Sequence, residues 1–200
     1  SASPEPVAAT SVNHMIWRIF RPRPRDRSID ELYGVIVAQA RSPGFYSRYG
    51  VPDSVDGRFD LIVLHLVLVI ERLGGEGAAA GRGIGQELFD AFCRDLDDNL
   101  REMGVGDFAV PKRMRRFGEA FYGRQTAYLA AFATADSPEL EKALQRNIFP
   151  GADDMRGAAR LADYARAARR QLAAQGDSAL LAGQVSFPQP DSIAEAIIHA

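Results

Sequence analysis

Two glycines between a pair of amphipathic segments constrain this chain more than any other feature. Before Gly104, the apolar residues at helical spacing are Phe89, Phe92, Leu96, Leu100 and Met103. After Gly106, they are Met114, Phe117, Phe121, Tyr128 and Phe132. Such spacing lines one face of a helix with apolar side chains. Gly104 suits the position that ends a helix, and Asp107 and Pro111 suit the start of the next one. The sequence therefore predicts two helices joined by a hinge, each burying one face.

The sign of the charge changes at this hinge. Residues 86–102 hold six acids and two arginines, whereas residues 112–124 hold five bases and one acid. Four of these bases form what we call the basic cluster: Lys112, Arg113, Arg115 and Arg116. They occupy the first turns of the second predicted helix, where the helix dipole disfavours each cation by a few tenths to about 1 kcal/mol. Two interpretations stay open: a charged outer face paired with the acidic helix, or a surface that binds an acidic partner segment, lipid headgroups or RNA.

The remaining periodic segments predict an all-α fold, with a single compact domain of six to eight helices over residues 28–200. We expect residues 1–27 to form an N-terminal arm, because Pro22 and Pro24 favour extended backbone. The predicted helices cover residues 28–41, 59–73, 86–103, 111–132, 137–149 and 152–175, with a turn at 178–182 and a short terminal helix from Ser192. Ser28 with Glu31 forms a capping-box pattern at the start of the first helix. Residues 74–85 are predicted to be a glycine-rich loop.

An aromatic segment follows the first predicted helix. Phe45, Tyr46 and Tyr49 lie close together before a turn at Val51 and Pro52. Rings of this size bury a large apolar area, so the segment is expected to pack against something. We take it as a candidate contact surface for an apolar partner.

Composition excludes several classes of protein. The net charge of −2 over 200 residues does not favour a DNA-binding chain, so any basic surface must be local. Cys93 is the only cysteine, which excludes a disulfide framework and is typical of a reducing compartment. The longest apolar run, from Leu61 to Ile70, is too short to span a bilayer, which needs about 20 residues. We also expect no secretion signal, because no basic start precedes an apolar stretch and a cleavage site.

No catalytic, cofactor or metal site is predicted, and we expect a protein that is not an enzyme. The sequence lacks the common nucleophile, zinc-protease and Cys-x-x-Cys motifs. His65 lies in an apolar run and favours a hydrogen-bonded core histidine over a metal ligand. Asp90, Asp97 and Asp98 are typical of a solvated helix face. The spacing Gly81-x-Gly83-x-Gly85 lacks the strand and the third glycine position that nucleotide binding requires.

Several longer segments, taken in order, resemble the ubiquinol–cytochrome c chaperone family. They are residues 32–41, Phe45-Tyr46, residues 50–53, residues 57–61, residues 97–112 and residues 121–124. The resemblance covers roughly residues 30–170 and is specific as a set. It implies a non-catalytic assembly factor for the cytochrome bc1 complex that binds newly made cytochrome b. For mitochondrial members it also implies a small partner protein and a contact with the ribosome. We expect a bacterial, cytoplasmic chain with peripheral contact to the inner face of the cytoplasmic membrane.

A chaperone of this kind needs aromatic surface for a hydrophobic client and charge to orient it. The candidate client-binding residues are Phe45, Tyr46, Tyr49, Lys112, Arg113, Arg115, Arg116, Phe121, Tyr122 and Arg124. Two other functions remain as alternatives. One is a helical protein that binds a lipid or quinone beside the apolar segment 59–73. The other is a helical, ligand-gated transcription regulator, which would need a basic recognition helix that residues 1–50 do not show.

Overall fold

The described part of the chain is all-α, as the sequence predicted. The computed structural model describes residues 24–74, 79–134 and 137–193, and no strand occurs within these ranges. The helices are α2 (Pro24–Ala40), α3 (Pro43–Ser47), α4 (Val55–Leu73), α5 (Ala79–Glu102), α6 (Val110–Phe132), α7 (Glu139–Ile148), α8 (Arg156–Ala173) and α9 (Asp177–Leu181). Most of the predicted arm, residues 1–23, and the terminal residues 194–200 lie outside the described residues.

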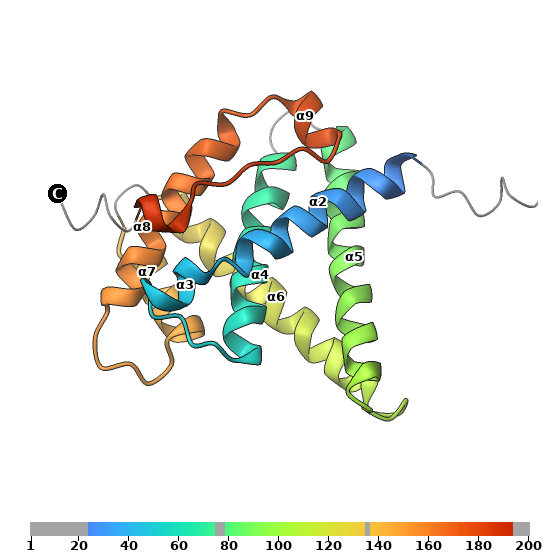
Figure 1. Ribbon diagram of the computed structural model, residues 1–200, viewed down its shortest axis with the longest axis horizontal. Coiled ribbons are helices and arrows are strands. Elements are labelled where there is room, and N and C mark those ends of the chain that lie inside the picture. Colours follow the sequence, from blue (N-terminus) through green and yellow to red (C-terminus); the bar gives the residue numbers. More distant parts are fainter. Residues whose placement is uncertain (1–23, 75–78, 135–136, 194–200) are drawn as a thin grey trace, which may run out of the picture.

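Helix α4 is the centre of the molecule. It packs against α2, α5, α6, α7 and α8, which surround it in Figure 1. Every residue from Asp60 to Val69 is buried, because the helix is apolar nearly all round. The Ser54 hydroxyl accepts a hydrogen bond from the Gly57 amide at 3.1 Å, which fixes where the helix begins. The prediction of a buried central helix over residues 59–73 is confirmed, with one further turn at its start.

His65 is a hydrogen-bonded core residue, as predicted. Its Nδ1 lies 2.7 Å from the Leu61 carbonyl oxygen, which only accepts, so Nδ1 carries the proton. Its Nε2 lies 2.9 Å from the Tyr164 hydroxyl and accepts from it. Gln39 in turn donates to the Tyr164 oxygen at 2.9 Å, which joins α2, α4 and α8 through one chain of hydrogen bonds. Complete burial lowers the pKa of His65 to about 4, so the imidazole is neutral.

The hinge forms as predicted, but its details differ. Gly104 has a φ of +74°, the left-handed conformation that ends a helix, and Pro111 lies in the first turn of α6. Asp107 does not cap α6. Its carboxylate instead accepts from Arg101 at 2.9 Å, and Arg101 also binds Asp97 at 2.6 Å. The guanidinium thus holds the end of α5 and the hinge together.

Three helix starts were wrongly predicted. Helix α2 covers Pro24–Ala40 of the described residues, so Ser28 lies inside it and is not a cap. Helix α5 covers Ala79–Glu102, so residues 79–85 of the predicted loop are helical. This first part of α5 packs against the rest of the fold, because Ile84, Gly85 and Leu88 are buried and α5 contacts both α4 and α2. Burial of these residues outweighs the low helix propensity of the glycines. Residues 190–193 are also helical, so Ser192 is not a cap.

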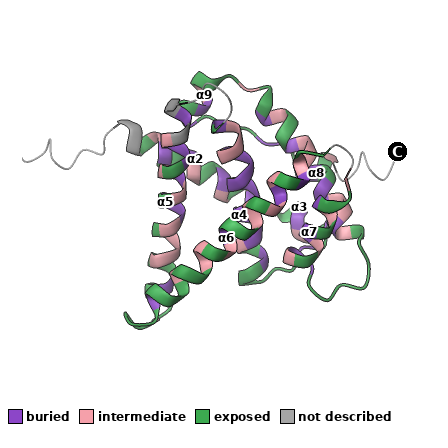
Figure 2. Cartoon of the chain, turned by 180° about the vertical axis from the view of Figure 1, so that it is seen from behind, coloured by how far each residue is buried: buried purple, intermediate pink, exposed green. Residues whose placement is uncertain are grey.

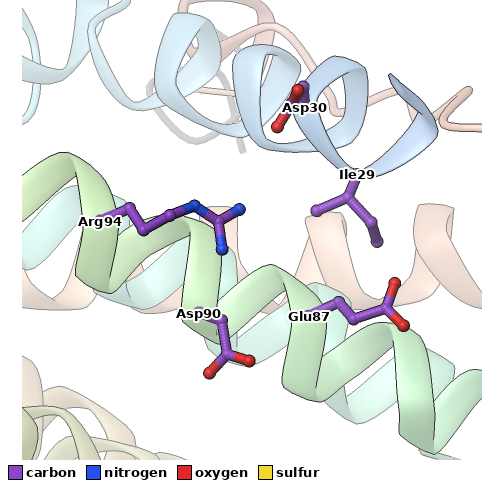
Figure 3. Close-up of a pocket in the computed structure, with 5 residues that line it drawn as sticks. All are labelled: Ile29, Asp30, Glu87, Asp90 and Arg94. Atoms are coloured by element: carbon purple, nitrogen blue, oxygen red, sulfur yellow. The ribbon is translucent and has the colours of Figure 1, made fainter. Parts of the chain in front are cut away.

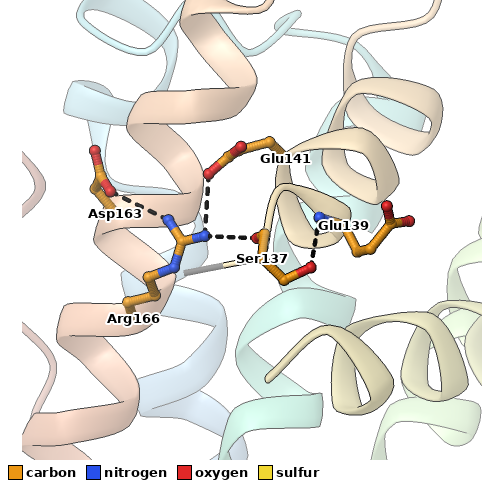
Figure 4. A network of polar contacts seen from close by, with 5 residues as sticks. All are labelled: Ser137, Glu139, Glu141, Asp163 and Arg166. Atoms are coloured by element: carbon orange, nitrogen blue, oxygen red, sulfur yellow. Dashed lines mark hydrogen bonds and ion pairs between the residues drawn. The ribbon is translucent and has the colours of Figure 1, made fainter. Parts of the chain in front are cut away.

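The start of α7 is fixed to α8 by Arg166. Its guanidinium donates to Glu141 at 3.0 Å, to the Ser137 carbonyl oxygen at 3.2 Å and to Asp163 at 3.2 Å (Figure 4). The Ser137 hydroxyl accepts from the Glu139 amide at 3.3 Å. Helix α7, predicted from residue 137, begins at Glu139, and Pro138 is its N-cap.

We expect Gly157→Ala to lower the free energy of unfolding by roughly 1–3 kcal/mol, as overpacking does. A Cβ there would lie 2.7 Å from the Phe149 ring and 2.8 Å from the Tyr49 carbonyl oxygen. Gly123→Ala in α6 is the matched control, because nothing lies within 4 Å of its added Cβ. That change should raise stability by about 0.4–1 kcal/mol. Urea denaturation measures both, and equal effects at the two positions would contradict the close approach at Gly157.

Candidate functional site

The end where α5 meets α6 projects from the body of the molecule, and we call residues 103–116 the tip. In Figure 1 the two helices converge there, away from the other helices. Figure 2 shows this end largely in the colour of exposed residues. Val110 is its only fully buried residue, while Val105 and Met114 are half-buried. The tip is thus a surface that the rest of the described chain leaves uncovered.

All four members of the basic cluster are exposed at the tip. Arg115 donates to Glu119 of the same helix at 2.9 Å. Lys112, Arg113 and Arg116 form no ion pair with any residue in the described ranges. The acids Asp97 and Asp107 are occupied by Arg101. The geometry therefore favours an open basic surface over a face paired with the acidic helix.

The tip also exposes two large apolar side chains. Phe108 is fully exposed, with a relative accessibility of 102%, and Met103 is 62% exposed. The apolar stripe predicted a buried Met103. That expectation is wrong, because α5 ends at Glu102 and the chain turns away from α4. Phe108 lies in the turn itself and belongs to neither apolar stripe, so helical spacing did not predict where it lies. Its position next to glycines that favour a turn was the one sign that it could be exposed.

The aromatic segment packs inward, and two of its three rings are core residues. Phe45 is fully buried and meets the Tyr164 ring edge-on at 4.8 Å between centroids. Tyr49 is also buried and donates its hydroxyl proton to the Pro190 carbonyl oxygen at 2.8 Å. Neither side chain offers the exposed surface expected of a client contact. Tyr46 is half-buried, with its hydroxyl 3.2 Å from the Ala40 carbonyl oxygen. Helix α3 and the tip lie at different sides of the molecule in both Figure 1 and Figure 2, so the two candidate surfaces do not meet.

Farther along α6, the predicted site divides between core and surface. Phe121 is buried against Phe89 at 4.7 Å between ring centroids, as the apolar stripe predicted, so its ring is not accessible to a client. The neighbouring Tyr122 is 53% exposed and stacks obliquely on Phe89 at 5.4 Å. Phe89 itself is half-buried. Tyr122 therefore remains an accessible aromatic side chain on the same helix as the basic cluster.

Arg124 is a structural residue rather than an open positive charge. Its Nε donates to the buried carboxylate of Asp60 in α4, and its Nη1 donates to the Ala120 carbonyl oxygen at 3.2 Å. The guanidinium also lies 5.6 Å from the centre of the Phe59 ring. Burial raises the pKa of Asp60 to about 6, although the Arg124 charge and hydrogen bond act to lower it. The pair joins α4 to α6. Sequence reasoning did not predict that Asp60 would be buried and paired, because a single acid at the edge of an apolar run forms no pattern.

A cleft of about 350 Å³ lies between α2 and α5. It is lined by Ile29, Asp30, Glu87, Asp90 and Arg94, and Figure 3 shows Ile29 and Arg94 directed into the space between the helices. Four of the five lining residues are charged, which does not suit a lipid tail or a quinone ring. Within residues 24–74, 79–134 and 137–193, no cluster of metal-ligating side chains occurs. Among the helices of those same ranges, none is long and apolar enough to cross a bilayer.

Comparison with known proteins agrees with the arrangement of the helices. The model of the ubiquinol–cytochrome c chaperone family matches residues 47–187, which include α4 to α9. The crystal structure of the Cbp3 homologue from Brucella abortus is 37% identical in sequence and has a TM-score of 0.77, covering 90% of this chain and 98% of that one.

Two vertebrate relatives are named as assembly factors of the ubiquinol–cytochrome c reductase complex. Ubiquinol–cytochrome c reductase complex assembly factor 1 of Xenopus laevis is 25% identical over 170 residues, covering 84% of each chain. The human protein of that name is 26% identical over 158 residues. Those residues are 78% of this chain and 52% of the human one, so this chain spans about half the length of the human relative.

Proposed function

The chain belongs to the ubiquinol–cytochrome c chaperone family, and on this premise we propose that it is an assembly factor of the cytochrome bc1 complex. The match of the family model over residues 47–187 carries the proposal, because these residues form the central helix and most of its neighbours. The relatives named as assembly factors of the same complex support it. The proposed client is newly made cytochrome b, and the proposed place of action is the inner face of the cytoplasmic membrane.

The proposed client surface is the exposed side of α6. It consists of the basic cluster, Lys112, Arg113, Arg115 and Arg116, followed by Tyr122. Charges on such a surface orient a partner and speed its approach, while an accessible aromatic ring supplies apolar contact. Tyr46 on α3 belongs to a second, smaller candidate contact. Phe45, Tyr49 and Phe121 would support these surfaces from the core, and Arg124 would hold α6 in place.

We expect deletion of the gene in its source organism to reduce the amount of assembled bc1 complex on native gels. A plasmid copy of the natural chain should restore the complex. A copy carrying Arg113→Glu and Arg116→Glu should restore it poorly while the protein accumulates normally, because exposed charges contribute little to folding. Unchanged levels of the complex after deletion would refute the assembly function. Loss of the variant protein itself would show that the cluster is structural.

Crosslinking in cells tests the client and its surface separately from assembly. Photo-reactive residues at Arg116 and Tyr122 should each form an adduct with cytochrome b. The matched control is Arg170, an exposed arginine of α8 with no ion pair to the described residues, where no adduct is expected. A third probe at Tyr46 asks whether α3 also contacts the client. Absence of adducts at both α6 positions would remove this surface from the proposal.

A further inference from the structure

The turn between α5 and α6 combines two properties that a stable, isolated fold does not need. Phe108 and Met103 are large apolar side chains that stay exposed, and they lie five residues apart in the sequence. Beside them, residues 103–116 carry four bases and one acid, and that acid, Asp107, is paired with Arg101. The chain as a whole is acidic, with a net charge of −2. The positive charge is therefore concentrated where the apolar side chains protrude.

From this combination we infer that the tip docks on the surface of an anionic lipid bilayer. Phe108 and Met103 would enter the boundary between headgroups and acyl chains, and Lys112, Arg113 and Arg116 would contact the phosphates. Amphipathic surfaces bind membranes through buried apolar area together with attraction between bases and anionic lipids. Arginine and lysine suit this depth, because their long stems lie along apolar surface while the charges reach the headgroups.

The charges on α5 are arranged in keeping with this orientation. Asp98 and Glu102, the exposed acids nearest the tip, are four residues apart on one face of α5. By helical periodicity that face is opposite the buried Leu100, and so points away from the core side on which α6 packs.

On α6, Lys112 and Arg116 lie opposite the buried Val110 and the half-buried Met114 by helical periodicity, so these bases point away from the packed side of α6. The acidic and basic faces thus lie on different sides of the tip. A bilayer approached by the α6 side meets the bases first and leaves these acids in water.

An anionic bilayer fits the tip better than a nucleic acid or an acidic peptide does. The bases alone would suit any of the three partners. The fully exposed Phe108 distinguishes them, because a membrane interface offers apolar surface next to phosphate charge. None of the helices in the described ranges is long and apolar enough to cross a bilayer. The inference does not rest on the proposed client.

Vesicle binding of the full chain tests the inference with lipid as the only partner. We expect sedimentation with vesicles of phosphatidylcholine and phosphatidylglycerol, weak binding to phosphatidylcholine alone, and loss of binding as salt rises. Arg113→Gln with Arg116→Gln should weaken binding by about 25-fold, at roughly fivefold for each base. Arg146→Gln with Arg170→Gln removes the same charge from α7 and α8 and should leave binding nearly unchanged.

The apolar contribution has its own pair of variants. Phe108→Ser should weaken vesicle binding several-fold, because a fully exposed ring loses nothing in the fold when removed. Met155→Ser, at a partly exposed residue before α8, is the control and should have no effect. In addition, Phe108→Trp should give fluorescence that is quenched by brominated lipids, beyond the signal of the natural chain with Trp17.

Several outcomes would overturn the inference. One is equal binding to neutral and anionic vesicles, and another is full binding by the Phe108→Ser variant. Binding of RNA or of an acidic peptide at the tip, with no vesicle binding, would assign the tip to that partner instead. If vesicles bind as expected but no cytochrome b adduct forms at Arg116 or Tyr122, membrane docking stands and the client surface fails. The reverse pattern keeps the client surface and removes the docking.

Discussion

Replacing Arg124 with methionine should lower the free energy of unfolding at pH 7 by about 3–5 kcal/mol, the cost of leaving a buried charge without its partner. Asp60 is only 2% exposed, so water does not replace the lost guanidinium. Methionine keeps much of the apolar stem and removes the charge and the hydrogen bonds. Arg124 also donates to the Ala120 carbonyl oxygen and lies against the Phe59 ring, so α6 loses contacts to α4 at one point.

A surface arginine of the same helix is the matched control. Arg115 pairs with Glu119 four residues later, and both side chains are largely exposed. Arg115→Met should therefore cost no more than about 0.5 kcal/mol. Urea denaturation followed by far-ultraviolet circular dichroism measures both variants. Similar small losses for Arg124→Met and Arg115→Met would show that the Asp60–Arg124 pair is not holding α4 to α6.

A double variant measures how much of the stability comes from the contact between Asp60 and Arg124 and how much from their other contacts. Asp60→Asn removes the carboxylate that Arg124 binds. If the two residues act mainly on each other, Asp60→Asn combined with Arg124→Met should cost much less than the sum of the single changes. Additive losses would mean that the two residues stabilise the protein through separate contacts.

The central helix and the hinge were predictable because local patterns determine them. Residues 59–73 are rich in leucine, valine and isoleucine over a length that is long for a strand, and Gly104 is the residue type that ends helices. The start of α5 was not predictable in this way. The glycines predicted a loop, whereas the helix is stabilised by packing against α4 and α2, which buries Ile84 and Leu88. Tertiary contacts outweighed propensity at that position.

For the candidate site, the exposure of the charged residues was easier to predict than the exposure of the aromatic residues. Charged residues are rarely buried without partners, so the exposure of Lys112, Arg113 and Arg116 follows from their type. Aromatic residues occur both in cores and at interfaces, and sequence does not separate the two. Phe121 and Tyr122 illustrate this, since adjacent rings on one helix differ from 1% to 53% in exposure. Their places depend on how α6 is rotated against α5, which is a property of the packed fold.

Between pH 4 and 6.5, the free energy of unfolding should show two opposing effects of pH. Burial raises the pKa of Asp60 and lowers the pKa of His65. Asp60 has a pKa of about 6 in the fold against 3.8 ordinarily, so between these values the folded state holds a proton that the unfolded chain has lost. Its contribution to stability falls as the pH rises. His65 has a pKa of about 4 against 6.5, so the unfolded chain holds the extra proton and its contribution rises with pH.

Because the two contributions oppose each other, the stability of the natural chain should change little from either one over this pH range. Variants that remove one group at a time should show each contribution separately. The free energy of unfolding of Asp60→Asn, minus that of the natural chain, should rise by roughly 2 kcal/mol from pH 4 to pH 6. The whole shift corresponds to about 1.4 kcal/mol for each pKa unit, and this pH window covers most of it. The same difference for His65→Gln should fall over pH 4 to 6.5 by a similar amount, because the variant no longer loses stability when the imidazole must be charged. Urea titrations at stepped pH measure both differences, and other carboxylates cancel in each subtraction. Difference curves that stay flat would show that neither buried group titrates with the shift that its burial implies, whereas curves of the same sign would mean that the Arg124 charge outweighs burial at Asp60.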